Sequence, residues 1–256
     1  MKPYRPKDSR DFFVGYLPPS GAVRRGMLLG GLAAAVGAGA AGWEIARRQG
    51  PSGDGLWCQG EARQWRGTLT IDPYPMLRLA KADGTSRSAL LCCPDKCGVR
   101  AEVEKFAGRS VTVLGSPIRR QGLLMIAAGS HYDWIAADPA AAPLPAVSAE
   151  TPLGPVTIEG ELMDSKCWLG AMRPGSGLTH KGCAVLCVRG GMPLMLVTPT
   201  GLGRSGALLA TDAAGRPFGE DVLPYLADPI RASGQASVSG DGWAQIRIDT
   251  ASLRRI

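Results

Sequence analysis

The chain has 256 residues, of which 45% are hydrophobic and 20% are charged, enough apolar side chains for the cores of one or two domains. Its 35 Gly and 20 Pro, with only 6% aromatic residues, argue against a helical bundle and favour short strands joined by many turns. The net charge of +7 is spread along the chain without a run of five Lys or Arg, which argues against a protein that binds nucleic acid.

The first predicted element is an apolar helix near the N-terminus. Residues 26–43 carry no charge and, at about 1.5 Å per residue, are just long enough to cross a bilayer core of about 30 Å. Positive residues outnumber negative ones ahead of this stretch. We therefore expect residues 1–23 in the cytoplasm, residues 24–46 in a bacterial inner membrane and the rest of the chain in the periplasm.

The start of this helix also resembles an export signal. Arg24 and Arg25 directly precede an apolar run, as in a twin-arginine signal, and the small residues Ala38 and Ala40 would suit a cleavage site. The aromatic lead of residues 11–19 favours an anchor that is retained, because a disposable signal does not need it. Whether the signal is cleaved stays open at this stage.

Small residues recur at helical spacing within the apolar stretch. Gly26 and Gly30 are four residues apart, as are Ala35 and Gly39, which lets another helix approach closely. Together with the aromatic segment of residues 11–19, this spacing predicts contact with other membrane-protein subunits. An export signal rich in alanine and glycine would show the same spacing.

The remaining chain consists of two halves with similar patterns, residues 56–135 and residues 156–256, separated by a linker rich in Pro and Ala at residues 136–155. Each half has three strand-like segments, a short helical segment and a final hairpin, with alternating apolar residues in the strands. This order predicts a mainly β protein with two small OB-like barrels after the N-terminal helix. A five-stranded barrel of another type is the alternative.

The second half contains a Cys/His segment, residues 163–193, that the first half lacks. Cys167, His180, Cys183 and Cys187 follow the spacing C-x12-H-x2-C-x3-C, and on a helix over residues 180–188 the last three would share a face. Three thiolates and an imidazole could hold zinc, copper or an iron–sulfur cluster. The alternatives are a disulfide from Cys167 to Cys183 or Cys187, as is common in exported proteins, and a redox-active thiol.

This segment resembles a motif found in uncharacterised bacterial secreted or membrane-anchored proteins. The motif runs D-x-x-C-Y/W-L-G and then H-x-x-C-A-x-x-C-x-x-x-G-x-P. It covers about 30 residues and the strand that follows. The matching positions are Asp164, Cys167, His180, Cys183, Ala184, Cys187, Gly191 and Pro193, with Trp168 where Tyr is more usual. The resemblance implies a common site but no reaction.

The first half carries four cysteines of its own, Cys58, Cys92, Cys93 and Cys97. In an exported domain this number favours two disulfides, although the short turn before Cys97 could also ligate a metal. Seven cysteines in the whole chain leave one unpaired, which indicates a free or metal-bound thiol. His131 is isolated in the sequence and is expected to be an ordinary surface or core residue.

No motif for covalent haem attachment, a Rieske cluster, a hydrolase nucleophile, a zinc protease or a phosphate-binding loop is present. The sequence therefore argues against an enzyme. Our first hypothesis is a periplasmic accessory subunit of a respiratory or electron-transfer membrane complex, stabilised by a disulfide or metal. The second is a protein that binds metal or carries electrons, or handles copper, through the Cys/His segment. A third is an enzyme with Cys183 or Cys187 as nucleophile and His180 as base.

Overall fold

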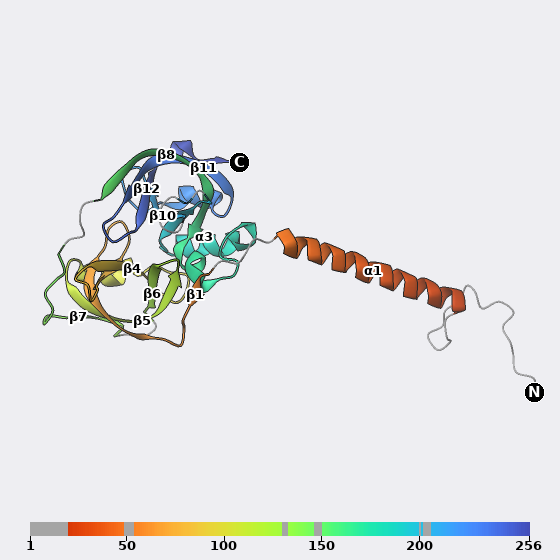
Figure 1. Cartoon of the computed structure of the whole chain (residues 1–256), viewed down its shortest axis with the longest axis horizontal. Coiled ribbons are helices and arrows are strands. Elements are labelled where there is room, and N and C mark those ends of the chain that lie inside the picture. The colour runs from red at the N-terminus through yellow and green to blue at the C-terminus, as the bar shows by residue number, and fades with distance from the viewer. Residues whose placement is uncertain (1–19, 49–53, 130–132, 146–149, 200, 202–205) are drawn as a thin grey trace, which may run out of the picture. The chain divides into compact units, whose positions relative to one another are not determined.

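A computed structural model describes residues 20–48, 54–129, 133–145, 150–199, 201 and 206–256. The chain divides into two compact units, Met1–Pro51 and Ser52–Ile256. The first contains a single described helix, and the second contains all of the described strands (Figure 1).

Helix α1 (Gly21–Arg48) is long and apolar enough to cross a membrane, so it could be an anchor or a signal sequence. Its 28 residues correspond to a length of about 42 Å at the usual helical rise. Glu44 and Arg47 form an ion pair of 3.0 Å in its last turns. The aromatic lead of residues 11–19 lies outside the described residues.

The first half forms a closed barrel of five strands. Its ring runs β2-β3-β4-β6-β5 and closes between β5 and β2; β4 and β6 are parallel, and the other pairs are antiparallel. The short strands β1 and β7 pair with β5 outside the ring. The bounds are β1 Leu56–Trp57, β2 Arg63–Thr70, β3 Met76–Ala80, β4 Ser86–Cys92, β5 Ser110–Arg120, β6 Leu123–Ala128 and β7 Ile135–Ala137.

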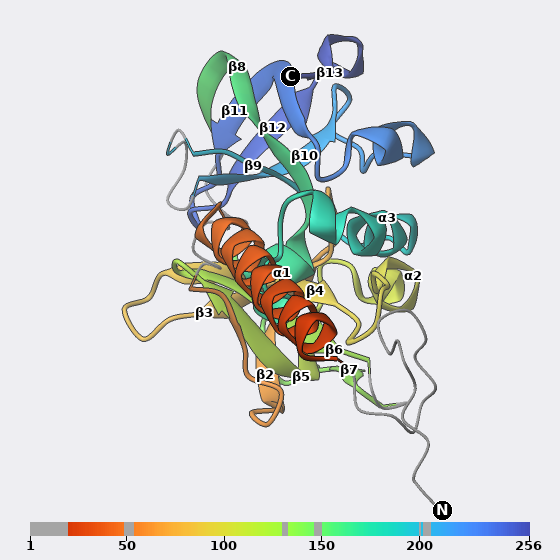
Figure 2. The ribbon, with the colours of Figure 1, turned by 90° about the vertical axis from the view of Figure 1, so that its right-hand side faces the viewer.

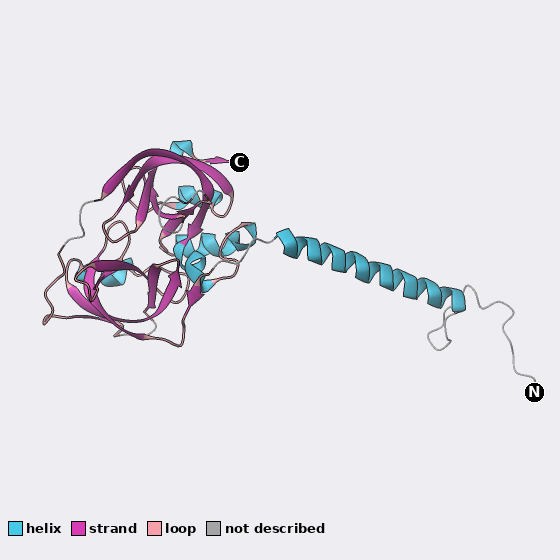
Figure 3. Cartoon of the chain, in the orientation of Figure 1, coloured by secondary structure: helices cyan, strands magenta, loops and turns pink. Residues whose placement is uncertain are grey.

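The second half also consists mainly of strands (Figure 3), which form a second closed barrel with the same order of pairing. Its ring runs β8-β9-β10-β12-β11, closes between β11 and β8, and again has one parallel pair, β10 with β12. Strand β13 pairs with β11 outside the ring. The bounds are β8 Thr151–Asp164, β9 Leu194–Val197, β10 Ala207–Asp212, β11 Pro229–Val238, β12 Ala244–Ile248 and β13 Arg254–Arg255. The predictions of a mainly β protein and of two barrels are confirmed.

Short helices connect the strands. In the first barrel, α2 (Arg100–Val103) and the 3-10 turn η1 (Glu104–Phe106) lie between the third and fourth ring strands. In the second barrel, η4 (Glu220–Tyr225) occupies the corresponding place, and η5 (Thr250–Ser252) precedes β13. Between β8 and β9 lie the irregular turn η2 (Cys167–Ala171), the turn η3 (Leu178–His180) and helix α3 (Lys181–Arg189).

The two barrels pack directly against each other. One apolar cluster fills the interior of the first barrel. The other fills the interior of the second barrel and continues onto residues of the first barrel, such as Leu90 and Met125. Two buried hydrogen bonds cross between them. The Tyr74 hydroxyl donates to the Ala210 carbonyl at 2.7 Å, and the Trp243 indole donates to the Ser88 carbonyl at 2.9 Å.

Helix α3 lies between the strands of the two barrels (Figure 2). Its C-terminal end contacts the loop that follows β4, where the Gly98 amide donates to the Gly190 carbonyl at 2.8 Å. A Cβ atom at Gly98 would overlap the carbonyl oxygen of Gly191, so only glycine permits this approach of the two backbones. The loop of the first barrel and the helix of the second are thus held side by side.

Candidate metal centre

The end of β8 buries a short polar sequence. Asp164, Ser165, Lys166 and Cys167 are each at most 4% exposed. Asp164 Oδ1 accepts a hydrogen bond of 2.9 Å from the Cys167 amide, in the manner of a side chain that caps a turn. The strand therefore ends in a turn that directs the Cys167 sulfur toward α3.

Helix α3 supplies the other thiols. His180 immediately precedes it, and Cys183 and Cys187 follow at spacings of three and four residues, so all three lie on one face as the sequence predicted. His180 and Cys187 are buried, and Cys183 is partly exposed. Cys183 is therefore the most exposed of these three residues.

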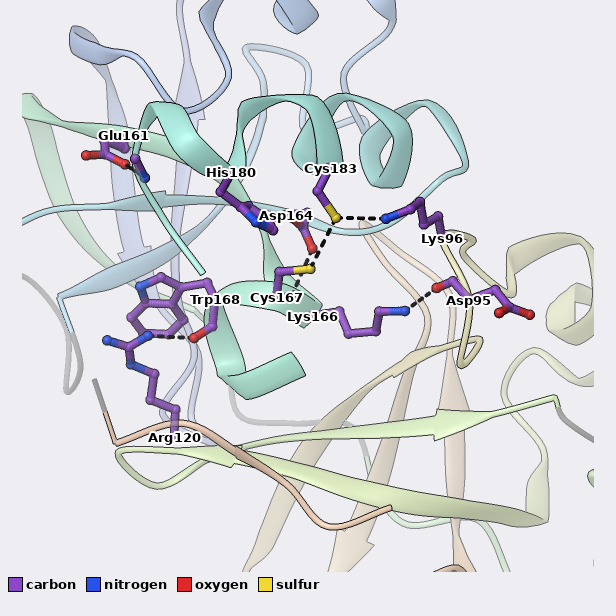
Figure 4. A network of polar contacts seen from close by, with 11 residues as sticks. Asp95, Lys96, Arg120, Glu161, Asp164, Lys166, Cys167, Trp168, His180 and Cys183 are labelled. Atoms are coloured by element: carbon purple, nitrogen blue, oxygen red, sulfur yellow. Dashed lines mark hydrogen bonds and ion pairs between the residues drawn. The ribbon is translucent and has the colours of Figure 1, made fainter. Parts of the chain in front are cut away.

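Asp164 orients the imidazole of His180 (Figure 4). Its Oδ2 atom lies 3.0 Å from His180 Nε2, and both side chains are at most 2% exposed. With Nε2 donating to the carboxylate, Nδ1 is the ring nitrogen left with a lone pair for a metal. Carboxylate–histidine pairs of this kind commonly orient the ligand in metal sites.

The candidate ligands form two overlapping groups. The donor atoms of Cys167, His180 and Cys183 lie within 4.8 Å of one another, and so do those of Asp164, Cys167 and Cys187. Cys167 belongs to both groups. The group around Cys167, His180, Cys183 and Cys187 could hold a metal ion.

The distance between the sulfurs of Cys167 and Cys183 is 3.9 Å. A disulfide has its sulfurs about 2.05 Å apart. Two thiolates on one tetrahedral zinc, with bonds of about 2.3 Å, are separated by about 3.8 Å. The structure therefore has Cys167, Cys183 and Cys187 as thiols, at a spacing that a shared ion would accept.

A loop of the first barrel covers this group of thiols. Cys93 and Cys97 form a disulfide that closes the loop. Within it, the Lys96 ammonium donates a hydrogen bond of 2.9 Å to the Cys183 sulfur. The buried Lys166 ammonium donates to the loop carbonyl of Pro94, at 2.7 Å. It also donates to the carbonyl of Asp95 (Figure 4). The loop therefore places one cation against a candidate ligand.

The thiols of Cys167 and Cys187 differ in pKa. The Cys167 thiol is the hydrogen-bond donor, which raises its own pKa, and it stabilises the Cys187 thiolate, which lowers the pKa of Cys187. The hydrogen bond that Lys96 donates to Cys183 raises the pKa of Lys96. Burial raises the pKa of Cys92 to about 12, so this thiol stays neutral and is a poor ligand.

The four residues predicted as ligands are thus brought together. The first-half cysteines are not part of this group. Cys93 and Cys97 are paired, whereas Cys58 and Cys92 are thiols. His131 lies outside the described residues. Lys96 was not predicted as part of the site, because its contact with Cys183 depends on the packing of the two barrels.

Comparison with protein-family models, with curated proteins and with solved structures finds no match to this chain.

Proposed function

We propose that this chain is a membrane-anchored protein that binds a single thiophilic metal ion through Cys167, His180, Cys183 and Cys187. The observation that carries the proposal is the buried Asp164–His180 pair beside two thiols whose sulfurs are 3.9 Å apart. A buried histidine held by a carboxylate, with thiols close by, is a typical environment of a metal ligand. This favours the metal hypothesis over a purely structural disulfide.

The spacing favours one ion over an iron–sulfur cluster. In a cluster the cysteines ligate different irons, which holds their sulfurs further apart than ligands of a single ion. Here the donors lie within 4.8 Å of one another in each group.

The charge balance favours a divalent ion, and we propose zinc. Three thiolates and Asp164 would carry four negative charges, and Lys96 and Lys166, which contact Cys183 and the covering loop, supply two positive ones. Lys96 is exposed, so solvent screens its charge, but the other charges are buried or partly buried, and such a group is stable only when it is nearly neutral. Zinc would cancel the remaining two charges, whereas copper(I) would leave one.

Metal analysis of the purified full-length chain in detergent tests this proposal. We expect about one zinc per chain, lost in Cys187→Ser and kept in Cys58→Ser, a matched control because Cys58 is also a thiol but is not among the donors. Circular dichroism of each variant separates loss of metal from loss of fold. A folded wild-type chain that binds neither zinc nor copper(I) after reduction would contradict the proposal.

We also propose that both barrels are OB-like. The support is the shared order of ring strands, first-second-third-fifth-fourth, with the short helix between the third and fourth strands in each. The long connection between the first two strands of the second barrel, from Asp164 to Leu194, then corresponds to the short connection between Thr70 and Met76 in the first. On this proposal, α3 and the candidate ligands are an addition to the basic barrel.

For the location, we propose that α1 anchors the chain in a bacterial inner membrane with the barrels in the periplasm. The support is the excess of positive charge before the helix and the Cys93–Cys97 disulfide, which is typical of an oxidising compartment.

A second candidate is an accessory subunit of a respiratory or electron-transfer membrane complex. The observation that favours it is that Gly26 and Gly30, and likewise Ala35 and Gly39, are spaced to share a face of α1, where small residues allow close helix contact. Sizing of the detergent-extracted chain tests this candidate, which requires migration with other membrane proteins. The third hypothesis is an enzyme with Cys183 or Cys187 as nucleophile and His180 as base. It is less well supported for Cys187, whose thiol is completely buried, than for Cys183, which is partly exposed.

A further inference from the structure

A cavity of about 290 Å³ lies at the end of the first barrel, apart from the metal ligands. It is bordered by the turn between β5 and β6, by the start of β4 and by the chain that leads into β1. Gln121 and Gly122 form the two-residue turn, both with positive φ, which is the geometry of a tight hairpin. This volume is at the lower end of small-molecule sites.

The cavity is lined by three arginines, Arg87, Arg119 and Arg120, and by one acidic residue, Asp54. Among the described residues, Asp54 is the ion-pair partner of Arg120, at 3.6 Å, and no acidic side chain pairs with Arg87 or Arg119. The lining thus has an excess of two positive charges. A phosphate group carries about 1.5 to 2 negative charges at neutral pH and would balance it.

Arg120 is held in a fixed position by the second barrel. Its Nη1 atom donates to the Trp168 carbonyl at 2.6 Å, and its guanidinium lies 4.1 Å from the centroid of the Trp168 ring (Figure 4). These contacts orient the guanidinium before any ligand binds. A preoriented guanidinium loses less conformational entropy on binding an oxyanion than a free one does.

The Nε atom of Arg120 faces the carboxylate of Asp54. Nε and Asp54 Oδ1 are 3.6 Å apart, which makes an ion pair but no hydrogen bond, and Nε is buried. Asp54 lines the cavity, so this end of the guanidinium borders it. An anion oxygen closer than that of Asp54 would give the buried Nε donor the hydrogen bond that it lacks among the described residues.

We propose that this arginine cavity is a binding site for a phosphate group, provided either by free phosphate or a phosphomonoester, or by the headgroup of an anionic phospholipid. The proposal does not depend on the metal site. Guanidinium groups match phosphate oxygens with paired hydrogen bonds, and three arginines line this one cavity.

Nuclear magnetic resonance of the full-length chain in an uncharged detergent tests the proposal. The Nε–H signals of arginine are observed separately from the backbone, and Arg120→Lys assigns the signal of interest. We expect inorganic phosphate to shift the Arg120 signal saturably. Arg87→Gln and Arg119→Gln should each weaken binding about tenfold, and Arg66→Gln, an exposed arginine on β2, should leave it unchanged.

Two further arms distinguish the source of the phosphate. Glycerol phosphate is titrated into the detergent sample, and the chain is also placed in bilayer discs of phosphatidylcholine with or without phosphatidic acid. A shift with the soluble phosphates identifies a soluble ligand, and a shift only with phosphatidic acid identifies a lipid headgroup. The proposal is overturned if no phosphate compound shifts the signal, if acetate binds as tightly as phosphate, or if neither Arg87→Gln nor Arg119→Gln weakens binding.

Discussion

The ammonium of Lys96 lies 2.9 Å from the sulfur of Cys183, although 87 residues separate the two in sequence and they belong to different barrels. Lys96 is at the tip of the loop closed by the Cys93–Cys97 disulfide, and the Lys166 ammonium holds the carbonyls of that loop. The first barrel therefore contributes a loop that covers the candidate ligands of the second barrel. This arrangement connects the disulfide to the candidate metal centre.

Removal of the disulfide should loosen this cover. In a Cys93→Ser/Cys97→Ser double variant, the loop is no longer closed, and Lys96 spends less time at Cys183. We expect bound metal to transfer to a coloured chelator about threefold to tenfold faster, since local opening of a covering loop limits loss of a buried ligand. Cys58→Ser is the control for loss of a cysteine outside the site. Equal transfer rates in all three proteins would show that the loop does not cover the ion.

Asp164→Asn should weaken metal binding without removing any of the four proposed ligands. The amide oxygen can still cap the Cys167 amide, but the charge that orients and polarises His180 is lost. Loss of such an orienting partner typically costs about 10-fold to 100-fold in metal affinity. The measurement is competition with a chelator of known affinity. His180→Ala should lose at least as much; an unchanged affinity in Asp164→Asn would mean that His180 is not a ligand.

Much of the fold follows from local patterns in the sequence. Alternating apolar residues located the ring strands, and the 3-4 spacing of His180, Cys183 and Cys187 placed them on one helical face. The packing between the barrels was not predictable in this way. The contact between Lys96 and Cys183 arises from packing of surfaces distant in sequence, and no periodicity within either half encodes it.

The cysteines of the first half illustrate the same limit. Four cysteines in one domain predicted two disulfides, but Cys92 and Cys93 are adjacent at the end of β4 and point to opposite faces. Cys92 enters the apolar cluster shared by the two barrels, whereas Cys93 faces the interior of the first. Cys93 is therefore able to meet Cys97, and Cys92 stays a buried thiol.

Asp228 should make stability depend on pH. Burial alone would raise the pKa of Asp228, but hydrogen bonds from Lys181, at 2.6 Å, and Arg255, at 2.7 Å, lower the pKa of this carboxyl below its ordinary value. These contacts tie the start of α3 to β13, and we expect Asp228→Asn to lower the free energy of unfolding by about 2 kcal/mol at pH 7.

The sign of the pH effect follows from this lowered pKa. The carboxylate stabilises the fold fully above its unfolded pKa of about 3.9, and its contribution is lost as the pH falls through the lower, folded value. Urea unfolding at a series of pH values should therefore show the difference between wild type and Asp228→Asn shrinking below about pH 4. Asp249→Asn is a control, because Asp249 caps a surface turn and pairs with no cation among the described residues. A difference that stays constant down to pH 2 would contradict the assignment.

Export of the barrels should depend on the arginines at the start of α1. We expect Arg24→Lys/Arg25→Lys to retain the chain in the cytoplasm if a twin-arginine signal directs it. Arg47→Lys/Arg48→Lys, at the other end of the same helix, preserves charge equally and should be exported normally.

Two measurements check this prediction. A protease added to spheroplasts should remove a C-terminal tag from the exported chain only. Intact mass under alkylating conditions should show the Cys93–Cys97 disulfide in the exported chain and not in the retained one, because the cytoplasm keeps thiols reduced. If both double variants are exported alike, Arg24 and Arg25 serve only as positive charges beside a membrane anchor.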